Sequence, residues 1–322
     1  MSLAAAGANA PTPSGLDQLR GSDFLTVSDV TADQLHELLD LAAYLKKERP
    51  RHGAPLAGKH LALIFAKPST RTRVSFELAM RELGGDVLVL FTRDMQIGRG
   101  ETLEDTGAVL SRYVSAIAMR TFAHSDLETL AHAATVPVIN MLSDRFHPCQ
   151  ALADMLTLKE RFGRLEGLRL AYIGDGNNVA HSLIEAGVML GVNVVIASPP
   201  GYEPDAGIVA LARQLGGRGS VEIVHDVFAA VKDADAIYTD TWTSMGAEAE
   251  AEQRHRVFAP YQVNAQLCAA ASSRHVFMHC LPAHRGQEVT DEVIDGEHSV
   301  VFDQAENRLH AQKALLWALL VD

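Results

Sequence analysis

The sequence contains little cysteine and no long apolar run. Its three cysteines, Cys149, Cys268 and Cys280, are odd in number and lack the spacing of a metal site. This scarcity argues against a disulfide framework and indicates a protein kept in a reducing, cytoplasmic environment. No apolar run reaches the ~18 residues that a membrane-spanning helix needs, so the sequence also argues against a membrane protein.

Positive charge is scarce as well. The chain carries 28 Lys and Arg residues against 40 Asp and Glu residues, which gives a net charge of −12 at pH 7. This balance argues against non-specific binding to nucleic acid or to an anionic membrane surface. Residues 1–22 lack the basic start and apolar centre of a signal peptide, and we expect them to form a flexible leader.

What the chain does contain is a repeated alternation of short apolar segments and amphipathic segments. In the first half this pattern predicts strands over 61–65, 86–90, 116–119 and 136–140, and helices over 31–47, 70–83, 102–113, 126–134 and 148–162. In the second half it predicts strands over 168–173, 193–197, 221–224, 236–239, 276–279 and 300–302, and helices over 179–190 and 304–320.

Such alternation predicts an α/β fold with two open parallel-sheet domains joined by interdomain helices and an active-site cleft between them. A chain of 322 residues is long enough for two domains. We expect a first domain over 23–147 with the C-terminal helix 305–322, and a second domain over 148–304. The polar motifs of the chain follow predicted strands, and open α/β sheets bind ligands at the carboxyl ends of their strands.

The first of these motifs is Ser69-Thr70-Arg71-Thr72-Arg73, at the start of a predicted helix. Free N–H groups and the helix dipole already make a helix N-terminus positive, so two arginines there are unfavourable unless an anion lies among them. Phosphate is the anion that this arrangement favours. The alternative is a solvated helix start, in which Ser69 is the N-cap and Arg73 pairs with Glu77 one turn later.

Two further motifs of the first half add hydrogen-bond donors. Arg120 follows the predicted strand 116–119, and His147-Pro148-Cys149-Gln150 opens the predicted helix 148–162. His147 can donate to a carbonyl oxygen, and Gln150 can bind an amide-like group. The alternatives are a surface charge for Arg120 and a helix N-cap for His147. Taken together, the motifs favour a small phosphorylated carbonyl compound as the ligand.

The glycine-rich segment Gly174-Asp175-Gly176 follows a strand in the second half. It is a weak dinucleotide motif, because Val179 stands where a third glycine is expected and the next strand ends without an acidic residue. Asp175, Asn177 and Asn178 instead offer polar groups to a zwitterion.

Two motifs of the second half carry reactive side chains. Asp240 begins a loop with an exposed glycine-containing turn, Gly246, and its carboxylate suits an amino group; the alternative is a capping Asp in an ordinary surface loop. His279-Cys280-Leu281-Pro282 follows another strand. Cys280 could be a nucleophile, a member of a proton network or a buried small residue, and the residues alone favour the last.

These segments together resemble the aspartate/ornithine carbamoyltransferase family, over nearly the whole chain from about Asp23 onward. The segment from Ser69 to Arg73 is similar to the family's carbamoyl phosphate signature, and that from His147 to Gln150 to its second carbamoyl phosphate motif. Asp240 with Ser244-Met245-Gly246, and the segment from His279 to Pro282, are similar to the ornithine branch of the family.

The resemblance implies an activity: transfer of the carbamoyl group of carbamoyl phosphate to the δ-amino group of L-ornithine, giving L-citrulline and phosphate. It implies no metal and no cofactor. It also implies a homotrimer, or a multiple of trimers, with a site shared between subunits. Both directions of the reaction use the same chemistry, and we favour the direction of arginine biosynthesis.

The resemblance also implies roles for individual residues. The phosphate would be bound by Ser69, Thr70, Arg71 and Thr72, and by Gln96 at an intersubunit site. Arg120, His147 and Thr72 would polarise the carbonyl oxygen. The carbamoyl NH2 would be held by Gln150 and the backbone of Cys280 and Leu281, with Arg308 nearby. Ornithine would be bound by Asn178, Asp240, Ser244 and Met245, and the residues closest to the chemistry would be Arg120, His147, Asp240 and Cys280.

Three alternatives stay open. The first is a carbamoyltransferase for aspartate, putrescine or an N-acylated ornithine. Asp240 with Ser244-Met245-Gly246 argues against these acceptors, because a free α-amino group needs an acidic partner and putrescine offers no carboxylate. The second is a non-catalytic phosphometabolite-binding homologue, which the intact set of Thr72, Arg120, His147 and Cys280 disfavours. The third is a dehydrogenase, which the weak glycine motif disfavours.

Overall fold

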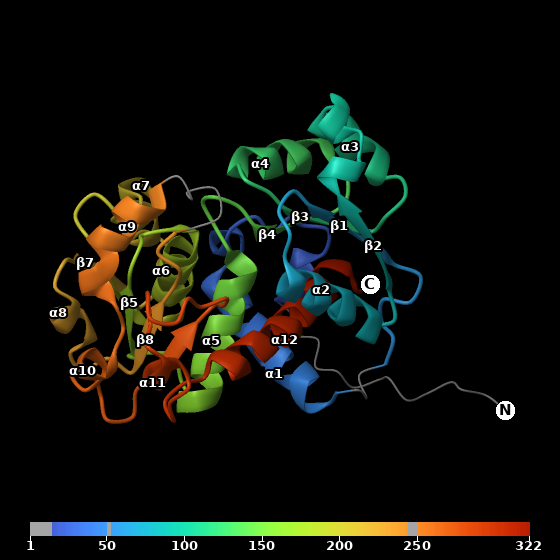
Figure 1. Cartoon of the computed structure of the whole chain (residues 1–322). Helices are drawn as coiled ribbons and strands as arrows, with labels where there is room; N and C mark the ends of the chain where they lie inside the picture. Colours follow the sequence, from blue (N-terminus) through green and yellow to red (C-terminus); the bar gives the residue numbers. More distant parts are fainter. Residues whose placement is uncertain (1–14, 50–52, 244–249) are drawn as a thin grey trace. The chain divides into compact units, whose positions relative to one another are not determined.

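The computed structural model describes residues 15–49, 53–243 and 250–322 (Figure 1). The chain divides into two compact units. Unit 1 comprises Met1–Leu156 and Asn307–Asp322, and unit 2 comprises Thr157–Glu306. Each unit contains one open sheet in which every strand pair is parallel, and this confirms the predicted fold class. The chain passes between the units within two helices, α5 (Pro148–Phe162) and α12 (Val301–Leu320).

The sheet of unit 1 has the strand order β2-β1-β3-β4. The central strands β1 and β3 are buried along almost their whole length, which explains why they are continuous apolar runs in the sequence. The edge strand β2 alternates between exposed and half-buried residues at its start. The strands are β1 (His60–Phe65), β2 (Asp86–Phe91), β3 (Ala116–Arg120) and β4 (Val138–Leu142).

The helices of unit 1 begin where the sequence offers a cap. The capping box predicted by Thr31 and Gln34 is present: the Gln34 N–H donates to Thr31 Oγ1 at 3.2 Å, and the Thr31 N–H donates to Gln34 Oε1 at 2.9 Å. The α-helices that precede α5 are α1 (Ala32–Lys47), α2 (Thr70–Glu82), α3 (Leu103–Leu110) and α4 (His124–Ala133), of which α3 and α4 lie side by side (Figure 1). Short 3-10 helices are η1 (Leu16–Leu19), η2 (Val27–Asp29), η3 (Thr92–Asp94) and η4 (Ile97–Arg99).

Several boundaries in unit 1 differ from expectation, and two of the differences bear on the packing of the unit. Strand β4 begins at Val138 and not at residue 136, because Pro137 has no N–H to donate to a sheet ladder. Residues 1–14 of the expected leader lie outside the described residues, but Leu16 and Leu19 of η1 are buried. The packed part of the chain therefore begins before residue 23.

The sheet of unit 2 has the strand order β7-β6-β5-β8-β9. The strands are β5 (Arg169–Ile173), β6 (Asn193–Ala197), β7 (Ser220–Val224), β8 (Ala236–Thr239) and β9 (Val276–His279). Helix α6 (Asn178–Leu190) follows β5 directly and is buried along almost its whole length. Further helices are α7 (Ala206–Ala212), α8 (Val227–Val231), α9 (Ala251–Phe258), η6 (Ala259–Tyr261), α10 (Ala265–Cys268) and α11 (Asp291–Ile294).

Alternation along the strands divides the core of unit 2 between the two faces of its sheet. Ala171 and Ile173 of β5 belong to a cluster that also contains Phe258 of α9 and Val231 of α8. Leu170 and Tyr172 point to the opposite face, where α6 contacts β6 and β7. Both faces of the sheet are therefore covered, as parallel sheets require.

The strand predicted over 300–302 is wrong. Val300 makes a backbone hydrogen bond to Phe277 of β9, with the Val300 N–H donating to the Phe277 carbonyl at 3.0 Å. The chain then enters α12 at Val301, because the Gln304 N–H donates to the Val300 carbonyl at 2.8 Å. The β-propensity of Val-Val-Phe is overridden by a helix that continues for 20 residues and gains its stability from packing.

Both sheets have a topological switch point. In unit 1 the chain runs from β1 outward to β2 and then returns to the other side of β1 as β3. In unit 2 it runs from β5 through β6 to β7 and returns beside β5 as β8. The connections that follow the two central strands therefore diverge, and a crevice at the carboxyl ends of these strands is the usual ligand position in open α/β sheets.

Among the residues that the structure describes, no helix is long and apolar enough to cross a membrane.

The glycines after β5 serve close backbone packing. Gly174 has a φ of 142°, which L side chains rarely adopt, and a Cβ on Gly176 would lie 2.1 Å from the backbone nitrogen of Pro204. The Gly176 N–H donates to the Tyr202 carbonyl at 2.8 Å, which fixes this approach. The turn is therefore glycine-rich because of its own packing and needs no nucleotide to explain it.

We predict that Gly176→Ala lowers the free energy of unfolding by about 1–3 kcal/mol, the usual penalty for an atom forced into a packed site. The Pro204 backbone cannot move aside as a flexible side chain would. Chemical denaturation of parent and variant measures the difference. Equal midpoints and slopes would show that the contact with Pro204 does not constrain the turn.

Candidate active site

In unit 1, the turn after β1 leads into α2 and carries the predicted phosphate motif. Ser69 is the N-cap of α2, and its Oγ accepts the Thr72 N–H at 3.4 Å. The Arg73 N–H donates to the Ser69 carbonyl at 3.2 Å. Acidic side chains are missing from the first turn of α2, although that is the position where they would be favourable. The helix start therefore keeps its positive potential.

Arg71 and Arg73 differ in their surroundings. Arg73 Nε lies 2.7 Å from Glu77 Oε1, so the alternative pairing that the sequence offered for this residue is present. Arg71 is exposed, and within the described ranges its guanidinium takes part in no hydrogen bond or ion pair. Of the two cations, Arg71 is the one available to an anion.

A buried arginine connects three elements of unit 1. Arg308 of α12 is only 4% exposed, and its Nη1 donates to Gln150 Oε1 at 2.6 Å. Its Nη2 donates to Thr72 Oγ1 at 3.3 Å. The Gln150 side chain continues the network, because its Nε2 donates to Asp154 Oδ1 at 2.7 Å. Thr72, Gln150 and Arg308, distant in the sequence, thus meet in one buried polar cluster.

His147 lies next to two cations of unit 1. His147 is buried and directly precedes α5. Arg120 is the last residue of β3 and lies at the switch point, where its carbonyl accepts the Ala66 N–H at 2.9 Å. Burial lowers the pKa of His147 well below its ordinary value of 6.5, and the charges of Arg308 and Arg120 lower it further. The imidazole is therefore neutral at physiological pH and acts as a hydrogen-bond donor or acceptor.

The other sequence-predicted positions of unit 1 are less enclosed. Thr70 is exposed at the first turn of α2, and Gln96 is exposed directly before η4. Cys149 lies in α5 with its Sγ 3.4 Å from the Asn140 carbonyl oxygen, and burial raises the pKa of its thiol to about 12. Cys149 is therefore an inert core residue.

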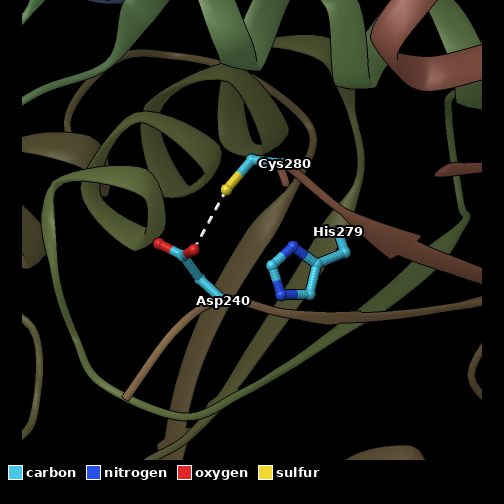
Figure 2. A group of neighbouring side chains, drawn as sticks. All are labelled: Asp240, His279 and Cys280. Carbon is cyan, nitrogen blue, oxygen red and sulfur yellow. Dashed lines mark hydrogen bonds between the residues drawn. The ribbon is translucent and has the colours of Figure 1, made fainter. Parts of the chain in front are cut away.

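In unit 2, Asp240 and Cys280 come together from β8 and β9. Cys280 Sγ donates to Asp240 Oδ1 at 3.0 Å, and Figure 2 shows the two side chains pointing toward each other. Asn177 Nδ2 donates to Asp240 Oδ2 at 2.9 Å, across the switch point between β5 and β8. Asp240 is 8% exposed, so the alternative of a capping Asp in a surface loop is wrong. Cys280 is a half-buried member of a hydrogen-bond network and not simply a small core residue.

The polar side chains of the turn after β5 are occupied within the unit. Asn177 Oδ1 caps α6 by accepting the N–H groups of Val179 and Ala180, at 2.9 and 3.2 Å. Asp175 forms an ion pair with Arg254 of α9. The expectation that Asp175 and Asn177 face a zwitterion is thus replaced by an ion pair and a helix cap. Asn178 is half-buried in the first turn of α6.

Arg254 is a residue that the sequence did not reveal. It is 7% exposed, its Nε donates to the Trp242 carbonyl at 2.7 Å, and its guanidinium lies 5.0 Å from the centre of the Tyr202 ring. Burial raises the pKa of Asp175 to about 6, although Arg254 opposes that shift. Arg254 also pairs with Glu250 one turn earlier, but its buried contacts with Asp175 and Tyr202 join segments far apart in the chain, which no local motif could indicate.

Asp240, His279 and Cys280 also form a cluster whose potential ligand atoms lie within 4.8 Å of one another. Hydrogen bonds account for this proximity. The Cys280 thiol donates to Asp240, and His279 Nδ1 accepts the Leu281 N–H at 2.9 Å. His279 Nε2 lies 3.2 Å from Glu288 Oε1. Since both ring nitrogens of His279 have partners, we assign no metal to this cluster.

Ser244 and Met245, which the sequence assigns to ornithine, lie outside the described residues. Leu281 is half-buried beside Cys280, with a φ of 58°.

Both units of the chain match known protein families. Residues 22–160 match the family description "Aspartate/ornithine carbamoyltransferase, carbamoyl-P binding domain", and residues 166–319 match "Aspartate/ornithine carbamoyltransferase, Asp/Orn binding domain". The chain is 56% identical to an ornithine carbamoyltransferase from Anoxybacillus flavithermus, over 94% of this chain and 98% of that protein. This chain belongs to the aspartate/ornithine carbamoyltransferase family.

Other members of the aspartate/ornithine carbamoyltransferase family agree in sequence and in fold. An anabolic ornithine carbamoyltransferase from Pyrococcus furiosus is 57% identical over 92% of this chain and 96% of that protein. A solved structure of the ornithine carbamoyltransferase from Pyrococcus furiosus superposes with a TM-score of 0.90, at 55% identity, over 94% of this chain and 98% of that chain. The two domain descriptions of the family match the two α/β units of this chain.

We predict that His147 remains neutral well below the pH at which an unperturbed histidine gains its proton. The unfolded chain has the ordinary pKa of ~6.5 and binds this proton more readily, so the contribution of His147 to stability is lost as the pH falls below 6.5. An NMR titration of the imidazole measures its pKa directly. His147→Gln should flatten the dependence of the unfolding free energy on pH between 6.5 and 5. A midpoint near 6.5 in the folded protein would contradict the burial argument.

Proposed function

We propose that this protein transfers the carbamoyl group of carbamoyl phosphate to the δ-amino group of L-ornithine, and that the products are L-citrulline and phosphate. The observation that carries the proposal is the pairing of two complementary sites. A switch point lined by cations and neutral donors in unit 1 accompanies a switch point with a buried carboxylate and a thiol in unit 2. The 56% identity to a named ornithine carbamoyltransferase supports the choice of acceptor.

The phosphate-binding role belongs to the first turn of α2. Ser69, Thr70, Arg71 and Thr72 offer hydroxyls, N–H groups and one guanidinium that no other side chain of the described residues engages. A helix N-terminus with such groups is a ready-made anion site. Gln96 would reach the same phosphate from a neighbouring subunit of a homotrimer.

Electrophilic activation belongs to Arg120, His147 and Thr72. As the amine attacks, negative charge develops on the carbonyl oxygen, and donors already held in place stabilise it without reorganisation. His147 suits this role as a neutral donor whose pKa is lowered by burial and by Arg308 and Arg120. Gln150, with Arg308 nearby, and the backbone of Cys280 and Leu281 would hold the carbamoyl NH2 group.

The nucleophile must lose a proton before it attacks. A lysine-like amine has a pKa of about 10.4, so deprotonation at pH 7 costs roughly 4–5 kcal/mol in water. Asp240, Asn178, Ser244 and Met245 would bind the α-amino and carboxylate groups of ornithine, and Cys280 would tune or relay the proton that the δ-amine loses. The hydrogen bond of 3.0 Å from Cys280 to Asp240 supports a proton network and gives Cys280 no need to act as the attacking group.

Cellular context completes the proposal. We place the protein in the cytoplasm and in arginine biosynthesis, a direction that agrees with the word "anabolic" in the name of the Pyrococcus furiosus relative. The carbamoyl phosphate role goes with unit 1 and the ornithine role with unit 2, in keeping with the descriptions that match residues 22–160 and 166–319.

The direct test supplies carbamoyl phosphate with one amine at a time and measures release of phosphate and formation of the carbamoylated product. Ornithine should give citrulline, because it can pair its α-amino group with Asp240 while its δ-amino group attacks. Aspartate has no second amine, N-acetylornithine has no free α-amino group and putrescine has no carboxylate, so each should give little product. Preference for another amine would identify a different carbamoyltransferase. Binding of both substrates without turnover would identify a non-catalytic homologue.

Arg71 and Arg73 form a matched pair on one helix. We predict that Arg71→Ala lowers kcat/KM for carbamoyl phosphate about 10- to 150-fold, since a hydrogen bond to a charged group contributes ~1.5–3 kcal/mol. Arg73→Ala should change it by less than about twofold, because Arg73 is engaged with Glu77 in a surface pair worth only a few tenths of a kcal/mol. Steady-state kinetics of both variants decide the matter, and equal effects would sink the assignment of phosphate to Arg71.

A further inference from the structure

His279 uses both ring nitrogens inside unit 2. Nδ1 accepts the Leu281 N–H at 2.9 Å, so the ring proton must lie on Nε2, which donates to Glu288 Oε1 at 3.2 Å. The side chains of His279 and Glu288 are fully buried. This arrangement selects one tautomer and one orientation of the imidazole.

Glu288 is also fixed in position, by hydrogen bonds to its Oε1. The His284 N–H donates to Glu288 Oε1 at 2.5 Å. Although burial alone would raise it, the pKa of Glu288 is lowered by the hydrogen bonds from His279 and from the His284 backbone. The backbone N–H of His279 donates to Gln304 Oε1 at 2.9 Å. A buried carboxylate and a buried amide thus brace His279 where strand β9 ends.

The backbone next to this brace, formed by His279 and Glu288, is strained. Leu281 has a φ of 58°, a left-handed conformation that is unfavourable for a residue other than glycine. The only side-chain acceptor on the Leu281 N–H in the described part of the chain is His279 Nδ1. Such a conformation persists when surrounding contacts over-determine it, and it is a common feature of ligand-binding positions.

The peptide bond converts this hydrogen bond into an orientation. The Leu281 N–H and the Cys280 carbonyl belong to the same planar trans unit, so they point in opposite directions. Holding the N–H on His279 therefore turns the Cys280 carbonyl away from the imidazole. It also fixes the Cys280 backbone, from which the thiol reaches Asp240 (Figure 2).

We propose that His279 and Glu288 are positioning residues that aim the Cys280 carbonyl at the NH2 group of the carbamoyl donor. This inference rests on the proposed function, because it assigns the carbonyl to a carbamoyl NH2. It predicts a discrimination between two ligands. Inorganic phosphate has no NH2 group, so its affinity does not depend on the brace, whereas the affinity for carbamoyl phosphate does.

Two substitutions of His279 separate its two hydrogen bonds. In His279→Asn, the amide oxygen stands as many bonds from the backbone as Nδ1 and can still accept the Leu281 N–H. In His279→Gln, the longer amide keeps a partner for Glu288 and leaves the Leu281 N–H without its acceptor. We expect His279→Gln to bind carbamoyl phosphate about 10- to 100-fold more weakly, as for a buried group deprived of its partner, and His279→Asn to bind it nearly as the parent does.

Calorimetric titration of each variant with carbamoyl phosphate and with inorganic phosphate measures this pattern. His275→Asn is the matched control. His275 is also buried and directly precedes β9, but its Nδ1 donates to the Ser272 carbonyl at 2.8 Å, and the Asn side chain should leave both affinities unchanged. If His279→Gln weakens the affinity for carbamoyl phosphate and for inorganic phosphate equally, the defect is merely structural. If it weakens neither affinity, His279 has no positioning role. Either result overturns the inference.

Citrulline formation by the parent protein is measured in parallel. A parent that forms none contradicts the proposed function, and the inference fails with it. A parent that forms citrulline, together with a His279→Gln variant whose two affinities match those of the parent, contradicts the inference alone. As a kinetic readout, His279→Gln should raise the KM for carbamoyl phosphate more than the KM for ornithine.

Discussion

The return of the chain across a central strand, in each of the two parallel sheets, is the constraint on which the polar geometry depends. In unit 1 the strands β1 and β3 are neighbours, and in unit 2 β5 and β8 are neighbours. The connections that follow the two strands of each pair lead to opposite sides of the sheet. Backbone groups and side chains at those strand ends cannot be covered by a crossover helix. Polar residues such as Arg120 and Asp240 are placed there because the fold leaves the position open.

The two switch points carry opposite electrostatic character. In unit 1, Arg308 is bonded to the neutral oxygens of Thr72 and Gln150, and His147 is kept uncharged by burial beside cations. In unit 2, Asp240 collects hydrogen bonds from Asn177 and Cys280 and remains a buried carboxylate. An anionic donor and a cationic acceptor fit such a pair of sites, in an otherwise acidic chain.

The segment from His279 to Leu281 shows how consecutive residues divide the work at one strand end. The buried His279 side chain accepts the Leu281 N–H through Nδ1, and its Nε2 donates to Glu288. Cys280 turns toward Asp240, and Leu281 adopts the left-handed conformation that this hydrogen bond supports. At this strand end, the position of the Cys280 thiol therefore depends on the orientation of the backbone as well as on the side chain itself.

Local sequence patterns determined the elements and the family, because periodicity, caps and contiguous motifs act over a few residues: the capping box at Thr31, the N-cap at Ser69 and the parallel strands are examples. Only the tertiary structure decided which polar groups meet. Asn177 and Asp240 are 63 residues apart, and Arg254 and Asp175 are 79 apart, so no local pattern could predict those pairs. Residues 301–302 are likewise helical against their β-propensity, because they begin a 20-residue helix that is buried from Asn307 to Leu320.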